Sequence, residues 1–275
     1  MTYKIQHRQK KAIRFDGVND KLAYTPSGAG VANLDMKPNE AFSMSLWTKQ
    51  IGTGGDSNCM QRWNVGSGGI AFGFYAAVSW SGQSWVDTLG VLMTSEGGAA
   101  AITLSSEAGT GARTTLRETN NWVHICFTYD GTGTAAGLKL FANGIDVTAA
   151  QVLHNGTAAQ FIDYAAGARI GTGADLQIGT DSGSGTKEAC YCQVAVHSIA
   201  LTATQVAEIY SGGTQNYRPG PCDLTQLSTS SSLVGYWLGD GSSDTVSTIQ
   251  DLSGNSFDMT GSNFSAGALM PCRIY

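Results

Sequence analysis

Hydrophobic and polar residues alternate over many short segments of the chain, which is the pattern of half-buried β-strands. Clear examples are residues 42–46 and 123–129, where every second side chain is apolar. Stretches rich in Gly, Ser and Thr separate such runs. Residues 52–69 are therefore interpreted as a loop, and residues 95–119 as loop-like with weak strands at best. The pattern as a whole predicts roughly ten or more short strands joined by loops.

Two local motifs are more specific. Asn143 and Gly144 lie between two alternating runs, and because both residues tolerate positive φ they predict a β-hairpin with a type I′ turn. Residues 201–213 predict the one convincing helix, because Thr202 and Gln205 have capping-box spacing and two glycines end the apolar stripe. Many strands and a single helix predict an all-β protein, an antiparallel sandwich of two sheets, with no second domain.

The composition agrees with this class and argues against others. The 275 residues include 36 glycines, only 13% are charged, and the net charge is −5, so no extended basic nucleic-acid surface is expected. No segment approaches the ~20 apolar residues of a membrane span. Residues 1–11 lack the apolar run of a signal peptide, so we expect a chain made in a cytoplasm that leaves the cell, if at all, without secretion.

Basic residues gather at the N-terminus, ahead of the first clear strand. We predict that residues 1–12 form an arm outside the sandwich and that residues 13–275 form a single domain. Within that domain, residues 213–232 are interpreted as a linker-like crossing and residues 233–270 as closing strands. The arm has two readings: solvated charges, or a docking arm for an acidic partner. Its basic residues are Lys4, His7, Arg8, Lys10 and Lys11.

Four blocks follow one another in an order that resembles a known family. They are "IRFDGVNDKL", "FSMSLWTK", "NNWVHICFTYDG…GLKLFANGIDV" and "LQIGTD…CQVAVHSIALTATQVAEIYSGG". Their order and spacing resemble the laminin-G-like, concanavalin A-like jelly roll, and the likeness covers most of the chain. The resemblance implies a jelly-roll fold. The family's usual Ile-Asp-Glu-Val run is here Tyr191, Cys192, Gln193 and Val194, so both acids are missing.

The segment "GYWLGDG…DLSGN" follows the helix, whereas in many relatives a similar segment precedes the "FDGVND" block. The chain thus resembles a jelly roll cut at a different point, as in some proteins of phages and marine bacteria, and this segment should pair with the first strand around residues 13–15. Its acids are interpreted as turn formers, with a metal loop as the alternative. The acids are Asp240, Asp244 and Asp251. Cys222 and Cys272 bracket the segment and are a candidate disulfide.

Catalytic chemistry has no positive support in the sequence. The glucanases of this fold place two carboxylates on one strand, and here the glutamates are isolated, so we expect no enzyme, no metal and no cofactor. His124 and His197 fall outside the apolar phase of their strands and are interpreted as surface or groove residues. Cys190 and Cys192 are in phase with residues 194 and 196 and should face the core as inert thiols.

Trp63, Trp80 and Trp85 lie in or beside the loops of residues 52–88 and are candidate glycan-binding residues, since aromatic faces stack on sugars. The alternative is that they are buried anchors, as large aromatics usually are.

Three functions remain open at this point. The favoured one is a structural protein of a phage virion, such as a capsid decoration (cement) protein, with capsid or other virion proteins as partners and homo-oligomerisation as an option. The second is a lectin-like module that binds carbohydrate or a host receptor. The third, a cryptic glycoside hydrolase, rests on fold analogy alone.

Overall fold

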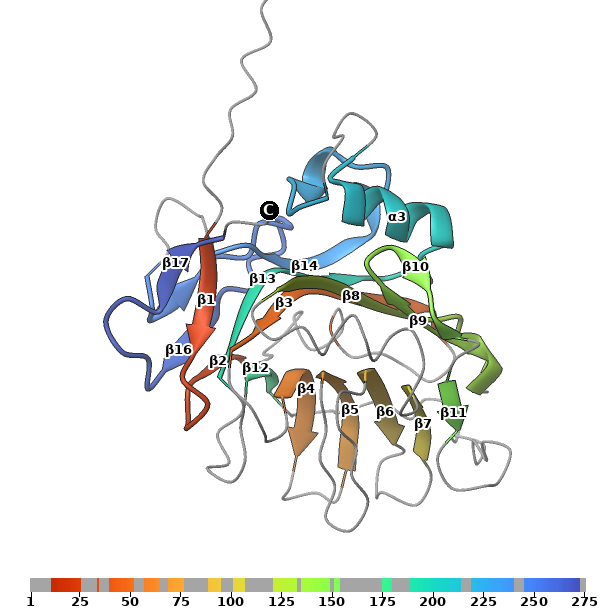
Figure 1. Cartoon of the computed structure of the whole chain (residues 1–275), viewed down its shortest axis with the longest axis horizontal. Coiled ribbons are helices and arrows are strands. Elements are labelled where there is room, and N and C mark those ends of the chain that lie inside the picture. Colours follow the sequence, from red (N-terminus) through yellow and green to blue (C-terminus); the bar gives the residue numbers. More distant parts are fainter. Residues whose placement is uncertain are drawn as a thin grey trace, which may run out of the picture.

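Two antiparallel β-sheets lie face to face in the computed structural model of the chain, and a short helix packs on the outside of one of them (Figure 1). This is the two-sheet sandwich that the sequence predicts. The structure describes residues 11–25, 34, 40–51, 57–64, 69–76, 89–94, 101–106, 121–132, 135–148, 151–153, 175–179, 188–213, 219–239 and 245–272.

The first sheet, here called sheet A, has the strand order β10-β9-β8-β3-β13-β1-β17 among the described residues, and β14 also pairs with β13. The long strand β13 has β3 on one side. On its other side β1 occupies the first half and β14 the second half. The strands are β1 (Lys11–Phe15), β3 (Phe42–Gln50), β8 (Trp122–Tyr129), β9 (Leu138–Ala142), β10 (Ile145–Asp146), β13 (Ala189–His197), β14 (Leu233–Trp237) and β17 (Leu269–Pro271).

The second sheet, sheet B, has the order β11-β7-β6-β5-β4-β12-β2-β16-β15 within the described part of the chain. Strand β4 corrects the sequence analysis, because it lies in a segment interpreted as a loop, and β7 lies in the segment where at most weak strands were expected. The strands are β2 (Lys21–Tyr24), β4 (Ser57–Asn64), β5 (Gly69–Ala76), β6 (Leu89–Thr94), β7 (Ala101–Ser106), β11 (Gln151–Leu153), β12 (Leu176–Gly179), β15 (Thr248–Ile249) and β16 (Met259–Ser262).

Apolar side chains from both sheets fill the space between them. Phe15, Leu46 and Phe127 come from sheet A, and Ile178 and Met259 come from sheet B. Each is at most 5% exposed. Burial of a large apolar side chain contributes about 1.5–3 kcal/mol, so this layer is the main source of stability.

Sheet A is also covered on its outer face, which the sequence analysis did not foresee. Helix α3 (Ala203–Ser211) and the 3-10 turns η3 (Leu224–Gln226) and η4 (Ser230–Ser232) form a third layer there, as Figure 1 shows for the helix. Their side chains pack on a second hydrophobic cluster. The described residues of the predicted linker-like crossing, from residue 219 on, therefore pack against sheet A. The cluster includes Trp47, Cys126, Phe141, Val206, Ile209, Leu224, Leu227 and Tyr236.

The two specific local motifs are confirmed. Asn143 and Gly144 have φ values of 50° and 76° and join β9 to β10. Helix α3 begins after Thr202, whose hydroxyl accepts from the Gln205 N–H while the Gln205 side chain accepts from the Thr202 N–H. The helix ends at Gly212, in the left-handed conformation at φ 72°.

The late segment supplies strands to both sheets. β17 pairs with β1, with Ala12 opposite Met270, so the late segment does reach the first strand. β14, however, pairs with β13 and not with β1, which corrects the expectation for residues 233–237. The predicted arm of residues 1–12 is also too long at its C-terminal end, because Lys11 and the buried Ala12 belong to β1. The other arm residues, Lys4, His7, Arg8 and Lys10, lie outside the described residues.

Candidate functional site

The tryptophans proposed for glycan binding are only partly placed. Trp63 lies in β4, between β5 and β12 in sheet B, and its backbone pairs with Ile70. The register of β4 against β5 shifts between Arg62 and Trp63. Such irregularities often re-aim side chains near functional sites. The side chain of Trp63, and both Trp80 and Trp85, lie outside the described residues, so the glycan groove stays a prediction.

Carboxylates are scarce on the described strands. Asp146, on the two-residue strand β10, is the only acidic residue among the strands that the structure describes. Glu188 lies just before β13 and pairs with Arg14, whose Nε donates to its carboxylate at 2.7 Å. Glu208, on α3, accepts from the N–H and hydroxyl of Ser228. Glu188 and Glu208 therefore make structural contacts.

His124 and His197 are completely buried, which corrects their interpretation as surface or groove residues. The third layer over sheet A is the reason. The His124 ring packs beside the stacked rings of Trp47 and Tyr210, with its centroid 5.4 and 6.0 Å from theirs, and neither ring nitrogen has a hydrogen-bond partner among the described residues. Desolvation lowers the pKa of His124 to about 3, so the ring is neutral at physiological pH.

His197 has one defined polar contact. Its Nδ1 lies 2.9 Å from the Ser232 hydroxyl, which itself donates to the Thr229 carbonyl at 2.7 Å. Because the serine proton is used in that second bond, His197 Nδ1–H is the donor in the first. Burial lowers the pKa of His197 to about 4. This pair joins β13 to η4, and the serine is 7% exposed, so the contact is structural and not a nucleophilic site.

Gln193 is a buried residue at the centre of a hydrogen-bond network that the sequence analysis did not predict. It has a φ of 51°, and β13 shifts its register against β3 between residues 192 and 195. Its Oε1 accepts from Trp47 Nε1 at 3.0 Å, and its Nε2 donates to the Cys222 carbonyl at 2.7 Å. The Tyr236 hydroxyl donates to the same carbonyl at 2.8 Å. This amide thus supplies structural hydrogen bonds at a position where the family usually has an acid.

The shift at Gln193 also corrects the expected phase of the strand. Val194 and Val196 face the core between the sheets, whereas Cys190 and Cys192 are buried in the cluster under the third layer. Burial raises the pKa of Cys190 to about 11, and the Cys190 thiol contacts the Met270 sulfur at 3.5 Å. Cys222 and Cys272 are both thiols in the structure, and their disulfide stays a prediction.

Asp251 organises the turn after β15. Its Oδ1 accepts from the N–H groups of Tyr236 and Ser253, both at 2.9 Å. Its Oδ2 accepts from the Ser253 hydroxyl at 2.8 Å and from the Phe257 N–H at 3.1 Å. Both carboxylate oxygens are thus used by protein donors, as expected of a turn former. Asp240 and Asp244 lie outside the described residues.

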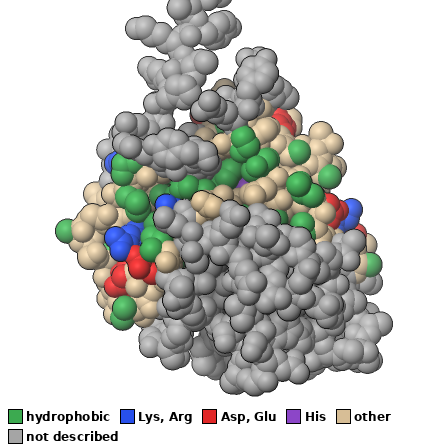
Figure 2. Space-filling view, viewed as in Figure 1, with side chains coloured by type: hydrophobic (Ala, Val, Ile, Leu, Met, Phe, Trp, Pro, Cys, Tyr) green, Lys and Arg blue, Asp and Glu red, His purple; other side chains and the backbone are tan. Residues whose placement is uncertain are grey.

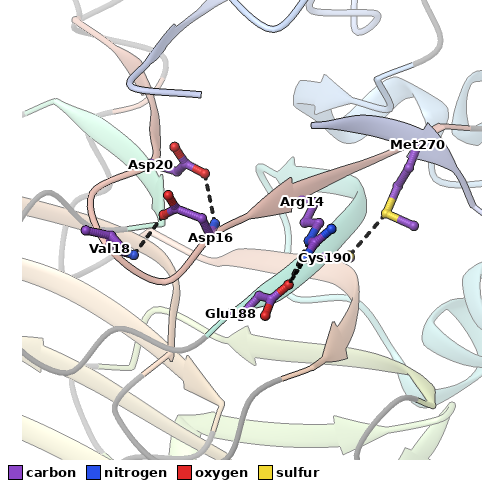
Figure 3. Close-up of polar contacts among 7 residues, drawn as sticks. All are labelled: Arg14, Asp16, Val18, Asp20, Glu188, Cys190 and Met270. Atoms are coloured by element: carbon purple, nitrogen blue, oxygen red, sulfur yellow. Dashed lines mark hydrogen bonds and ion pairs between the residues drawn. The ribbon is translucent and has the colours of Figure 1, made fainter. Parts of the chain in front are cut away.

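Two more aspartates share the turn between β1 and β2. Asp16 Oδ1 accepts from the Val18 N–H, and Asp20 Oδ2 accepts from the Asp16 N–H, each at 2.8 Å (Figure 3). Asp20 is only 4% exposed, and its Oδ1 has no hydrogen-bond partner among the described residues. Burial raises the pKa of Asp20; the hydrogen bond from the Asp16 N–H opposes this shift, and the Asp16 charge adds to it. The sequence signal "DGVND" indicated a turn but not this buried carboxylate.

The visible surface divides into two kinds of area. Figure 2 shows hydrophobic side chains in a band across the visible face, and acidic and basic side chains close together on the side where β1 and β16 lie and again on the opposite side. Within the described residues, no three acidic, histidine or cysteine side chains are placed to hold a metal. The described helices include none with the length and apolarity of a membrane span.

Residues 24–207 match the family model of the concanavalin A-like lectin/glucanases superfamily, in its laminin-G-like branch. The chain belongs to this superfamily. The match confirms the resemblance found in the ordered sequence blocks. No curated protein matches the sequence.

Several solved structures are similar to the chain. A candidate carbohydrate-binding protein from Bacteroides ovatus is 17% identical, with a TM-score of 0.56 over 93% of this chain and 59% of that one. The chain therefore spans 59% of that relative's length. A heptameric SAP-like pentraxin from Limulus polyphemus is 14% identical, covering 85% of this chain and 93% of that one at a TM-score of 0.44. The CBM40 domain of the Ruminococcus gnavus IT-sialidase is 14% identical, covering 73% and 98% at 0.42.

Proposed function

We propose that this chain is a carbohydrate-binding module without catalytic activity. The superfamily of the chain includes both lectins and glucanases. The observation that carries the proposal is the scarcity of acidic residues on the described strands. Among the described strands only β10 bears an acid, the single residue Asp146. Hydrolysis of a glycosidic bond needs two carboxyl groups on either side of that bond. The described strands therefore favour the lectin side of the family over the glucanase side.

The binding face that we propose is sheet B, around the end of β4 and the loops beside it. Trp63 is placed in β4, and the register of this strand against β5 is irregular next to it. Trp80 and Trp85 follow in the same part of the sequence. Tryptophan rings offer flat apolar surface together with an N–H donor, and both features suit the apolar face and hydroxyl groups of a sugar ring.

The virion role predicted from the sequence has no support in the comparisons, and it stays a prediction. The same is true of a phage capsid partner and of homo-oligomerisation. The similar Bacteroides ovatus protein is named for carbohydrate binding, and its likeness to this chain extends to the fold alone. The lectin reading is therefore preferred to the virion reading.

The test is binding of the full chain to a panel of soluble polysaccharides and arrayed glycans, with Trp63→Ala, Trp80→Ala and Trp85→Ala beside it. We expect binding to one glycan class, weakened about tenfold by at least one substitution, which corresponds to ~1.4 kcal/mol. Trp122→Ala, on β8 of sheet A, is the matched control and should bind normally. Release of reducing sugar ends from the bound glycan, or binding unaffected by all three substitutions, would contradict the proposal.

A further inference from the structure

Sulfur-containing side chains gather on the outer face of sheet A, near β17. Cys190 lies on β13, Met270 lies on β17, and Cys272 directly follows β17. Strand β1 runs between β13 and β17 and pairs with both. Its residue opposite Met270 is Ala12, whose short side chain leaves room for longer ones to meet above β1. The Cys190 Sγ and Met270 Sδ atoms are 3.5 Å apart, and Figure 3 shows the two side chains pointing toward each other.

Cys272 reaches the same place from the chain segment that carries Met270. Only Pro271 separates the two residues, and both pack, partly buried, against the hydrophobic cluster that contains Cys190. Cys190 itself is completely buried. Met270 and Cys272 are partly exposed and lie between it and the solvent side of the cluster, so they give an ion a way in. Cys190, Met270 and Cys272 are here called the sulfur cluster.

Two cations flank the buried thiol of this cluster. Lys49 on β3 and Arg14 on β1 lie directly opposite Cys190, one on each side. Side chains directly opposite each other on neighbouring strands share one face and interact. Burial raises the pKa of Cys190, both cations oppose this shift, and the charges of Glu188 and Cys272 add to it. Cys272 is therefore within electrostatic range of the thiol, and the two cations favour its anionic form.

We propose that Cys190, Met270 and Cys272 form a Cu(I) site at the β17 end of sheet A, separate from the glycan face. Soft thiolate and thioether ligands select Cu(I), whereas zinc is bound by thiolate, imidazole and carboxylate groups. A coordinating thiol is deprotonated outright, so each cysteine releases its proton to water as the ion binds. Two thiolates and one Cu(I) leave one excess negative charge, which Lys49 and Arg14 offset. Cys190 is then a ligand and not the inert thiol that the sequence analysis expects.

The test is an anaerobic titration of the reduced full chain with Cu(I), in competition with the chelator bathocuproine disulfonate. The thiols are kept reduced because the predicted disulfide of Cys272 with Cys222 would remove one ligand. We expect one Cu(I) per chain and, by X-ray absorption, a coordination shell of sulfur atoms. Loss of a residue that merely supports a metal ligand costs about 10–100-fold in affinity, so Cys190→Ala should cost about 100-fold or more and Met270→Leu about tenfold or more.

Cys126→Ala is the matched control, because Cys126 is a completely buried thiol of the same hydrophobic cluster, and its Sγ contacts the Phe127 carbonyl oxygen at 3.6 Å. This variant should bind Cu(I) as the natural sequence does. Unchanged affinity in both Cys190→Ala and Met270→Leu would overturn the proposal, and so would an equal loss in Cys126→Ala or a shell of oxygen or nitrogen atoms.

If Cys190→Ala does not fold, Met270→Leu decides alone, since this exchange conserves side-chain volume. Failure to bind Cu(I) would leave glycan binding untouched, because the sulfur cluster lies on sheet A and the proposed glycan face on sheet B.

Discussion

Replacing Asp251 by alanine should be among the most damaging single changes in the late segment. The carboxylate receives four hydrogen bonds, from Tyr236, Phe257 and twice from Ser253. All four bonds are partly buried, but the two Ser253 bonds stay within one short turn. The other two connect this turn to the backbone of β14 and to Phe257, just before β16.

A hydrogen bond to a charged group contributes about 1.5–3 kcal/mol. The two bonds to Tyr236 and Phe257 therefore predict a loss of about 3–6 kcal/mol in the free energy of unfolding for Asp251→Ala. This is a large part of the ~5–15 kcal/mol that stabilises a typical domain. The effect should spread beyond the turn, because Trp237 next to it is 1% exposed and donates from Nε1 to the Phe257 carbonyl at 2.8 Å.

The assay is urea unfolding followed by tryptophan fluorescence and circular dichroism. Asp258→Ala is the control, since this exposed acid lies in the same loop but accepts one bond, from the Asp251 N–H at 2.8 Å. Asp258→Ala should lower the free energy of unfolding by about 1 kcal/mol or less. If Asp251→Ala were no more destabilising than Asp258→Ala, the late segment would not be held by this carboxylate and the reasoning would be refuted.

Two further predictions concern the layer outside sheet A. His124 and His197 are neutral in the folded chain, and their pKa values are lowered there, so the unfolded chain binds protons at a higher pH than the folded one. The free energy of unfolding is therefore at its full value above pH 6.5. It falls by about 1.4 kcal/mol per pH unit for each ring as the pH drops toward 4. His124→Phe should remove about half of this fall without loss at pH 7, and an unchanged pH profile of the urea midpoint would count against it. Gln193→Ala leaves the Trp47 N–H without its acceptor and should cost about 2–4 kcal/mol, whereas a loss below about 1 kcal/mol would show that the network adds little.

Much of the fold could be predicted because its strands obey local rules. Strict alternation located β8, the Asn143-Gly144 pair located the β9–β10 hairpin, and capping residues located α3. The sequence analysis did not predict β4, because its polar sequence, Ser57–Asn64, lacks the apolar alternation of a strand with one face in the core. Its pairing with β5 and β12 is a long-range property that no local pattern records.

The burial of the histidines could not be predicted for a different reason. The cover over sheet A comes partly from a Ser- and Thr-rich crossing whose few apolar residues, such as Leu224 and Leu227, are too sparse to indicate packing. The bulge at Gln193 then shifted the phase of β13, so counting alternate residues placed Cys190 and Cys192 on the wrong side. Likewise, the unpartnered oxygen of Asp20 depends on how the turn folds against β12.

The central claim is that this chain binds a carbohydrate and does not cleave it. The most direct measurement is a calorimetric titration of the folded full chain with the glycan selected from an array, followed by product analysis of the same sample. The account predicts saturable binding with the glycan recovered intact. Absence of binding to every glycan class, or recovery of shortened glycan, would contradict it.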